Sequence, residues 1–460
     1  MRGGLCFQVS PDLITLMKTL SEKNTRREFI KTASKATAAA AVSIATHAHA
    51  AGSDRIKVGI VGTGGRGSGA IVQNMLNEGC ELHAVGEAFD DRLARSLPNI
   101  RKQLESKGKF NLNADRTFVG LDAYKHVIDA SDMVILTTPP GFRPMMFEYA
   151  VEQGKHVFME KPVCTDAAGY RRVLAAARKA DEKGLKVVVG LQRRYEDLYL
   201  QSYDAIQAGE IGEVIGAQCY WNGRGVWQRP RKKLAETLGR EPTEMEYQIY
   251  NWYYFTWAGG DNICEQHVHN LDVCNWFTGG LPVEGYGSGG RAVRTGEDTG
   301  EIFDHHCIEF KMANGGYYHS DSRHFPNSDN KVGEVIIGSK GRLEISSNRG
   351  AIFYDHKGKA VRRIQRNRQQ ISKEVEHAVL HQHVREDKPI NNAYYGATSS
   401  MTAVFGRMCT YSGKRITWDD AVNSKVSLFP ERLAWDANPR NMPLPDGSYR
   451  HAVPGRTEVL

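Results

Sequence analysis

The sequence predicts an α/β domain built on a parallel sheet, followed by an α+β domain with a large, mostly antiparallel open sheet. The chain has 460 residues, of which 41% are hydrophobic and 25% charged, a globular composition too long for one ordinary core. From residue 55, apolar strands alternate with helices at βαβ spacing, whereas beyond residue 190 strands alternate with Gly-rich turns. We therefore expect an α/β domain over 55–180, an α+β domain over 181–425 and an extended tail over 426–460.

The first fifty residues are typical of an export signal. Arg26 and Arg27 stand in a Thr-Arg-Arg-Glu-Phe-Ile-Lys segment, a weakly apolar stretch follows over 36–45, and Ala48-His49-Ala50 ends the region. This pattern resembles a twin-arginine signal with its cleavage site and predicts a periplasmic or otherwise exported protein. A basic N-terminal helix is the alternative, and translation from Met1 or from Met17 remains open. The apolar stretch is too short to span a bilayer.

The charge of the mature region argues against nucleic acid as a partner. The whole chain carries +7, but residues 1–50 hold seven basic and three acidic side chains, which leaves +3 for the remainder. A nucleic-acid-binding protein needs a dense basic face to displace counterions from phosphates. The eight cysteines include no CxxC pair and no closely spaced framework, so we interpret them mostly as core thiols.

A Gly-rich turn follows the first expected strand, which covers 56–61. It reads Gly-Thr-Gly-Gly-Arg-Gly and opens a helix around 70–76. This GxGxxG context is typical of a Rossmann dinucleotide-binding domain, because the first glycine permits the turn, the second lets the backbone approach a pyrophosphate, and the third allows close helix packing. The residues expected to bind the cofactor here are Gly62, Gly64, Gly65, Arg66 and Gly67.

An acidic residue indicates which dinucleotide is bound. Glu87 lies twenty positions past Gly67, after the second strand over 82–85. Its carboxylate would accept hydrogen bonds from a ribose diol and repel a 2′-phosphate, which favours NAD over NADP. Asp90 and Asp91 are alternatives for this role.

Two later strand ends also point to the cofactor. The strand over 133–138 ends in Thr138-Pro139-Pro140, and the strand from His156 ends in Glu160-Lys161-Pro162. The carboxyl ends of parallel strands meet at one edge of the sheet. We therefore expect Thr138, Pro139, Glu160 and Lys161 to lie by the cofactor, with Lys161 beside the nicotinamide.

The segment 259–276 holds the candidate catalytic groups of the second domain. At helical spacing, Glu265, His269 and Asp272 fall on one face. A histidine can take the hydroxyl proton of an alcohol as hydride leaves the carbon. His267 and His269 are two residues apart and would point to different faces of a helix, and no HExxH spacing exists, so no metal site is expected.

The Gly-rich turn, the Glu160-Lys161-Pro162 motif and the acid-x-x-x-His segment together resemble the Gfo/Idh/MocA family of oxidoreductases, over about residues 55 to 420. The resemblance implies a Rossmann domain followed by an open-sheet domain, with Lys161 and His269 as catalytic groups. Glu265 stands where many members have Asp, and His267 where many have Gly. Arg194, Tyr195 and His267 are further candidates for binding substrate.

These observations favour an NAD-dependent oxidoreductase that oxidises a ring hydroxyl of a sugar or glycoside. Because an exported enzyme has no external pool of NAD, we expect the cofactor to be held tightly. A redox-neutral glycoside hydrolase, resembling NAD-dependent α-N-acetylgalactosaminidases, is the alternative, and a non-catalytic sugar-binding protein is a third. We also expect a homo-oligomer that assembles through the second sheet.

Overall fold

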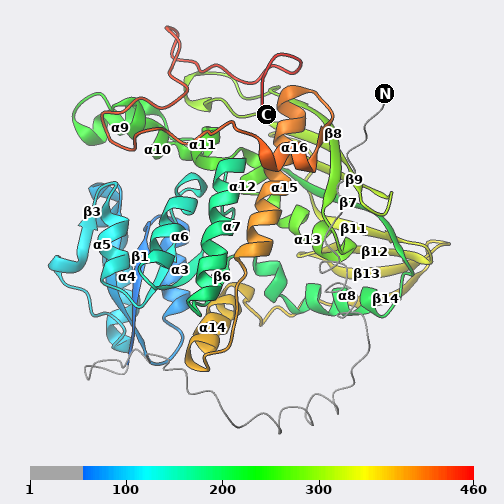
Figure 1. Ribbon diagram of the computed structural model, residues 1–460, viewed down its shortest axis with the longest axis horizontal. Helices are drawn as coiled ribbons and strands as arrows, with labels where there is room; N and C mark the ends of the chain where they lie inside the picture. The colour runs from blue at the N-terminus through cyan, green and yellow to red at the C-terminus, as the bar shows by residue number, and fades with distance from the viewer. Residues whose placement is uncertain (1–54) are drawn as a thin grey trace, which may run out of the picture. The chain divides into compact units, whose positions relative to one another are not determined.

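The computed structural model describes residues 55–460 (Figure 1). The first part of this region is a six-stranded sheet in the order β3-β2-β1-β4-β5-β6, in which every neighbouring pair is parallel. Its strands are β1 (Ile56–Val61), β2 (Cys80–Glu87), β3 (Thr117–Val119), β4 (Met133–Leu136), β5 (His156–Met159) and β6 (Val187–Val189). The order reverses beside β1, as in a Rossmann fold. The expected parallel sheet is confirmed.

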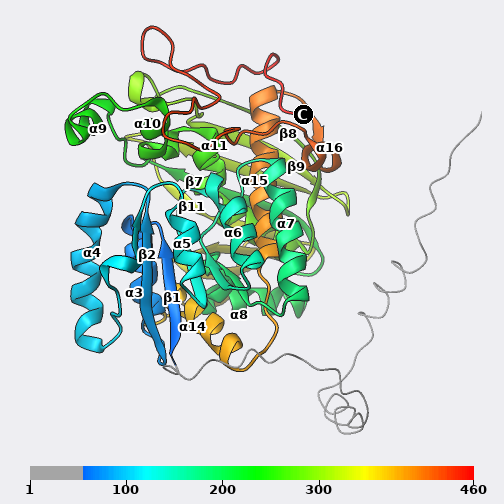
Figure 2. The ribbon, with the colours of Figure 1, turned by 60° about the vertical axis from the view of Figure 1, so that its left-hand side comes forward.

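Helices cover both faces of this sheet, which explains why its central strands are apolar throughout. On one face lie α3 (Gly65–Asn74) and α4 (Asp90–Leu104), whose side chains share a core with Leu380 of α14 (Ser372–Arg385). On the other face lie α5 (Ala123–Asp129), α6 (Arg143–Glu152) and α7 (Ala167–Glu182). Figure 2 shows α3 and α4 separated from α5 and α6 by the strands.

The domain boundary expected at residue 180 falls too early. Strand β6 lies beyond it and pairs in parallel with β5. Two helices from near the end of the chain also return to this domain, because α14 packs on α3 and α15 (Ala393–Ser412) packs on α7. An isolated bridge joins Val187 to Asn391. The first domain is therefore completed by α14, Asn391 and α15, which lie far from it in the sequence.

The second sheet has nine strands in the order β14-β13-β12-β11-β7-β10-β9-β8-β15. All neighbouring pairs are antiparallel except β10 with β7, so the expected mostly antiparallel sheet is confirmed. The strands are β7 (Val214–Gly223), β8 (Pro282–Gly290), β9 (His305–Met312), β10 (Tyr317–His324), β11 (Lys331–Gly338), β12 (Gly341–Ser346), β13 (Gly350–Asp355), β14 (Ala360–Ile364) and β15 (Ile416–Thr417).

Helices of the second part pack on this sheet and reach the first part. The remaining helices are α8 (Asp197–Gln207), α9 (Arg231–Leu238), α10 (Glu244–Tyr250), α11 (Thr256–Gly259), α12 (Asn262–Glu265), α13 (Val268–Thr278) and α16 (Trp418–Asn423). Helix α13 packs on β7 and β11, and α15 on β8 and β9. Helix α15 thus lies between the two sheets, with nearly all of its residues buried, and joins them in one core.

Residues 426–460 extend across the body without forming a helix or a strand (Figure 1). The amide of Leu428 donates to Asp166 at 2.7 Å, the carbonyl of Trp435 accepts from the Thr243 hydroxyl at 2.6 Å, and the Tyr449 hydroxyl donates to Glu244 at 2.5 Å. The tail is therefore held against the body along its length.

The expected twin-arginine signal lies outside the described residues. Within residues 55–460, no helix combines the length and the apolar character that crossing a bilayer demands. The seven cysteines of this region are all unpaired, and six of them are buried, as expected of core thiols.

Candidate active site

The Gly-rich turn between β1 and α3 borders a cavity of about 350 Å³ at the carboxyl ends of the strands. Gly62 has a φ of +91°, and its carbonyl accepts a hydrogen bond from the Thr137 hydroxyl at 2.6 Å. A Cβ at Gly67 would lie 2.0 Å from the Gly62 oxygen, whereas a Cβ at Gly64 or Gly65 would meet nothing within 4 Å. No side chain caps the start of α3. The turn thus presents open backbone and helix N–H groups to the cavity, which fits a pyrophosphate.

Glu87, at the end of β2, is hydrogen-bonded to this turn. Its carboxylate accepts hydrogen bonds from the amides of Thr63 and Ala88, each at 2.8 Å, and from the Thr63 hydroxyl at 3.3 Å. Glu87 is 7% exposed and lines the cavity. Neither Asp90 nor Asp91 is among the lining residues, so Glu87 is the one of these three carboxylates that lines the cavity.

The second domain covers part of the same cavity. Trp227 and Arg229 line it, and the Arg229 guanidinium lies 3.9 Å from the Trp227 ring centre. Arg92 and Arg229 both donate to the carbonyl of Tyr250, at 3.1 and 2.6 Å. Burial, together with the neighbouring Arg92, lowers the pKa of Arg229 to about 10. Two cations therefore lie close together beside Glu87, on opposite domains.

A second cavity, of about 360 Å³, continues from the first. The two share six lining residues: Arg66, Thr137, Thr138, Trp252, Glu265 and Gln266. The second cavity also contains Lys161, His269 and Glu160. The strand-end and second-domain residues singled out in the sequence thus meet in one continuous space.

Lys161 and Glu265 form an ion pair inside this space. The Lys161 Nζ donates to Glu265 Oε1 at 2.9 Å and also to the Glu265 backbone carbonyl. Their side chains are 13% and 19% exposed. Glu265 reaches Lys161 because the expected single helix is broken: α12 ends at Glu265, and α13 starts at Val268.

His269 stands in the first turn of α13 and is 6% exposed. Burial, and then the charges of Lys161, Arg193 and Lys373, hold the pKa of His269 well below its usual value. The imidazole is therefore neutral at pH 7. Its Nδ1 atom is enclosed without a hydrogen-bond partner, which leaves Nε2 as the nitrogen open to the cavity. The ring of Trp221 stacks beside it, with centroids 6.1 Å apart.

Glu160 and Arg66 link the strand end to the Gly-rich turn. The Arg66 Nε donates to the Glu160 carboxylate, and its other nitrogens donate to Gln73 at 2.6 Å and Glu376 at 3.3 Å. Burial opposes ionisation of Glu160, but Arg66, Lys161 and Arg143 outweigh it and lower its pKa. Pro139 lines the first cavity, which we call the nucleotide cavity because the Gly-rich turn borders it, and Thr138 lines both cavities.

The three candidates for binding substrate, Arg194, Tyr195 and His267, line neither cavity. Arg194 forms a forked ion pair with Asp272, at 2.8 to 3.1 Å, because both groups are largely buried and need a partner. Tyr195 donates to Asn392 at 2.5 Å. The sequence interpretation that these three residues bind substrate is therefore corrected, because they line neither cavity. Asp272 likewise does not line the cavity with Glu265 and His269, since it pairs with Arg194.

His267 is fully enclosed against the second sheet. Its Nε2 lies 2.9 Å from the Ser320 hydroxyl and 3.6 Å from the Cys219 sulfur. His267 and His269 therefore point to different sides. Among residues 55–460, no three His, Cys, Asp or Glu side chains gather as a metal ion would require.

Sequence reasoning missed several lining residues of the second cavity. Arg143, Gln192 and Lys373 line it and stand in no motif, whereas Trp221 and Trp252 belong to aromatic runs whose sequence fits a core and a sugar-binding cleft equally. Lys373 in particular comes from α14, more than two hundred residues beyond Lys161. No sequence signal places it there.

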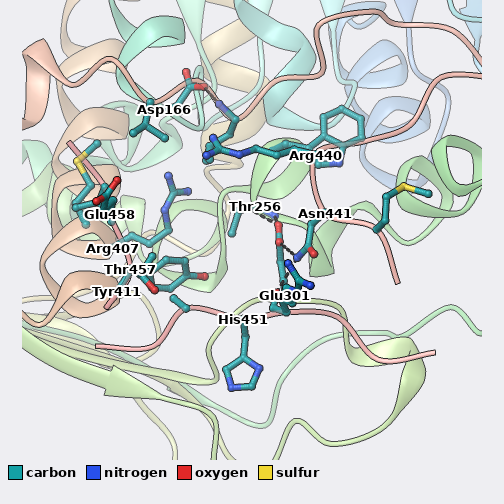
Figure 3. Close-up of a pocket in the computed structure, with 18 of the residues that line it drawn as sticks. Asp166, Thr256, Glu301, Arg407, Tyr411, Arg440, Asn441, His451, Thr457 and Glu458 are labelled. Carbon is teal, nitrogen blue, oxygen red and sulfur yellow. Dashed lines mark hydrogen bonds between the residues drawn. The ribbon is translucent and has the colours of Figure 1, made fainter. Parts of the chain in front are cut away.

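A separate cavity of about 510 Å³ lies under the C-terminal tail and is lined by none of the expected site residues. Figure 3 shows its side chains, with Asn441 of the tail joined to Glu301. Glu301 also accepts from the Thr256 amide at 2.7 Å and from its hydroxyl. These carboxylate contacts anchor the tail to the body.

Comparison with known proteins identifies the class of the first domain. Residues 56–190 match the Gfo/Idh/MocA model, described as "Oxidoreductase family, NAD-binding Rossmann fold". Residues 56–190 are therefore similar to the NAD-binding Rossmann domain of that oxidoreductase family.

Individual relatives are similar over part of the chain. Inositol 2-dehydrogenase of Klebsiella pneumoniae (strain 342) is 30% identical over 189 residues, covering 40% of this chain and 50% of that protein. The NAD(+)-dependent scyllo-inositol 2-dehydrogenase of Bacillus subtilis (strain 168) is 36% identical over 36% of this chain and 42% of its own length. A glycosyl hydrolase family 109 protein of Shewanella baltica (strain OS195) is 26% identical over 44% and 47%. The chain thus spans about half the length of these relatives.

Solved structures share the two-domain fold. Aldose-aldose oxidoreductase from Caulobacter crescentus aligns with a TM-score of 0.61 at 16% identity, covering 79% of this chain and 99% of that one. Scyllo-inositol dehydrogenase from Lactobacillus casei, solved with NAD(H) and scyllo-inositol, aligns with a TM-score of 0.58 at 18% identity and the same coverage.

Proposed function

We propose that the protein is an NAD-dependent oxidoreductase that oxidises a ring hydroxyl of a sugar or glycoside. The observation that carries this proposal is the meeting of Lys161, Glu265 and His269 in one cavity that continues into the nucleotide cavity. Relatives named as inositol dehydrogenases support the same class of alcohol substrate.

The residues divide the work on the hydroxyl group. Neutral His269 accepts the hydroxyl proton at Nε2, and the Lys161 ammonium donates a hydrogen bond to the same oxygen, which favours alkoxide character. Glu265 orients the Lys161 ammonium through their 2.9 Å contact. The chemistry that the nicotinamide supplies, when bound, is acceptance of the hydride. Trp221 and Trp252 offer apolar ring faces to the sugar.

We further propose that NAD, rather than NADP, is loaded before twin-arginine export and stays bound. Glu87 supports this choice, because it lines the nucleotide cavity and its carboxylate would repel a 2′-phosphate of NADP. The cover that Trp227 and Arg229 provide from the second domain supports slow release. In this proposal the protein also forms a homo-oligomer through its second sheet, where Ile215 and Tyr317 are 50% and 47% exposed on adjacent strands.

The redox-neutral glycosidase is the second candidate, favoured by the glycosyl hydrolase relative. That route needs a further acid–base group to remove the proton beside the oxidised carbon. His267 is enclosed elsewhere, so Glu265 is the group in the cavity that could take this role.

The test begins with purified protein, whose absorbance should show NAD that is released only on denaturation. Aryl glycosides and free sugars are then incubated with it in deuterated water. A stable keto sugar supports the oxidoreductase, whereas deuterium at C2 together with aglycone release identifies the glycosidase. Lys161→Ala and His269→Ala should each abolish turnover while keeping the bound cofactor. Lys357→Ala and His356→Ala, two exposed residues of the β13–β14 turn, are matched controls. Full turnover by both active-site variants would refute the assignment.

A further inference from the structure

The cavity that holds Lys161 and His269 contains more positive than negative side chains. Its lining includes the cations Arg66, Arg143, Lys161 and Lys373, and the carboxylates Glu160 and Glu265. A sugar with only hydroxyl groups does not require such an excess. The excess positive charge lies on those cations that have no carboxylate partner in an ion pair.

Two of the cations are neutralised within the protein. Lys161 is paired with Glu265 at 2.9 Å. Arg66 is paired with Glu160, and a further nitrogen lies 3.3 Å from Glu376. The lining carboxylates are therefore both engaged, and the unmatched charge belongs to Arg143 and Lys373.

Arg143 is a buried cation without a carboxylate partner. It is 1% exposed, and its Nη1 atom donates to the carbonyl of Leu136 at 3.0 Å and to the Thr138 hydroxyl at 3.4 Å. Its Nε atom has no hydrogen-bond partner, and no carboxylate of residues 55–460 lies within 4.0 Å of the guanidinium. Burial lowers the pKa of Arg143 to about 10, and Glu160 and Glu265, which lie beyond ion-pair distance, offset this effect only in part. Because burying a charge without a close partner is costly, an anion beside Arg143 would offset more of this cost.

Lys373 supplies a second unmatched charge from the first turn of α14. It is half-buried, and its ammonium makes no hydrogen bond or ion pair within 4.0 Å in the described part of the chain, although Glu376 of the same helix interacts with it at longer range. Its positive charge nevertheless acts on the cavity, because Lys373 is one of the cations that lower the pKa of His269.

The phosphates of the cofactor do not account for these two cations. The open backbone at Gly64 and Gly65 faces the nucleotide cavity, and neither Arg143 nor Lys373 lines that cavity. Both belong only to the cavity with the catalytic groups. We therefore expect the anion that pairs with Arg143 and Lys373 to be part of the substrate.

We propose that the substrate is an acidic sugar, whose carboxylate is bound by Arg143 and Lys373 while a ring hydroxyl lies against Lys161 and His269. This inference rests on the proposed function and adds the substrate class. A guanidinium matches the planar geometry of a carboxylate, and an ammonium adds a point charge. A sulfate ester shares the negative charge but is not planar.

The experiment compares three methyl glycosides that differ at C6 alone: the glucuronide, the glucoside and the glucoside 6-sulfate. Oxidation by the holoenzyme should have a kcat/KM at least about tenfold higher for the glucuronide than for the glucoside, and this advantage should shrink as salt concentration rises. Equal or better oxidation of the glucoside would overturn the inference. A preference for the sulfate would confirm the anion site but contradict its assignment to a carboxylate.

Lys373→Gln gives a second, independent measurement. The ratio of kcat/KM between glucuronide and glucoside should fall about tenfold in this variant, whereas Lys357→Gln should leave the ratio unchanged. An unchanged ratio in Lys373→Gln would remove Lys373 from the site.

Binding separates this inference from the proposed function. Thermal stabilisation of the holoenzyme by glucuronide, but not by glucoside, supports the anion site even if neither sugar is oxidised, and in that case the proposed oxidation is what fails. Oxidation of the glucoside without any effect of the added carboxylate gives the opposite outcome.

Discussion

Two glycines of the Gly-rich turn should respond differently to substitution by alanine, one mainly in stability and the other mainly in cofactor binding. A Cβ at Gly67 would lie 2.0 Å from a backbone oxygen and 2.7 Å from the Thr137 hydroxyl. Because backbone must move to relieve that contact, we expect Gly67→Ala to lower the free energy of unfolding by about 3 kcal/mol. Gly64 has a φ of −60°, and its Cβ would meet nothing within 4 Å. We therefore expect Gly64→Ala to cost only about 0.5 kcal/mol, from a poorer helix cap.

The methyl group of Gly64→Ala instead occupies space that a pyrophosphate needs. One misplaced methyl group weakens binding by about tenfold. NAD at a hundred times its dissociation constant stabilises the wild type by about 2.7 kcal/mol, and the same concentration should stabilise Gly64→Ala by about 1.4 kcal/mol. Urea unfolding of protein that has been denatured and refolded without cofactor, with and without added NAD, measures both quantities.

The matched pair makes the outcome decisive. Gly67→Ala should be unstable without cofactor, whereas Gly64→Ala should be nearly as stable as the wild type but respond less to NAD. Equal stabilisation of wild type and Gly64→Ala by NAD would show that no pyrophosphate lies against this turn. It would then refute the placement of the dinucleotide.

Three further predictions follow from buried contacts. Arg194→Leu leaves the Asp272 carboxylate buried without its cationic partner, so urea unfolding should show a free energy of unfolding lower by about 3 kcal/mol. The KM for sugar should be unchanged, and a raised KM would show that Arg194 binds substrate. Burial, and then Arg385 and Lys109, lower the pKa of His381 to about 3. Between pH 3 and its ordinary value of about 6.5 the unfolded chain binds a proton at His381 that the folded chain does not. This residue alone should therefore lower stability by about 2 kcal/mol from pH 8 to pH 5. His381→Gln should reduce the fall in stability over this range by that amount, and an unaltered slope would contradict the shift. Trp227→Ala removes a ring that lines the nucleotide cavity, so fluorescence of bound NADH should reveal release about tenfold faster. Unchanged release would show that this ring of the second domain does not retain the cofactor.

Much of the nucleotide site could be predicted because its signals are local. A strand, a Gly-rich turn and a helix follow one another within twenty residues, and the glycines at 62 and 67 each meet a steric requirement that neighbouring backbone imposes. Strand ends of a parallel sheet lie at one edge in any such fold. Lys161 and Glu87 could therefore be placed in the cleft from their positions alone.

The substrate side resisted prediction because it depends on long-range packing. Helical spacing from Glu265 to Asp272 indicated one continuous polar face, but the chain turns at Gln266 and His267, and this break sends Glu265 to Lys161 and Asp272 to Arg194. Arginine patterns do not reveal whether a guanidinium will meet a carboxylate from another segment.

The sequence by itself determined the order of domains, the dinucleotide fold and the lysine and histidine that carry the proposed chemistry. Only the tertiary structure decided which other charges join them, since α14 brings Lys373 back to the site and α6 leaves Arg143 buried without a carboxylate. The physical reason is that local backbone geometry follows from neighbouring residues, whereas the pairing of buried charges follows from segments that meet only when the whole chain has packed.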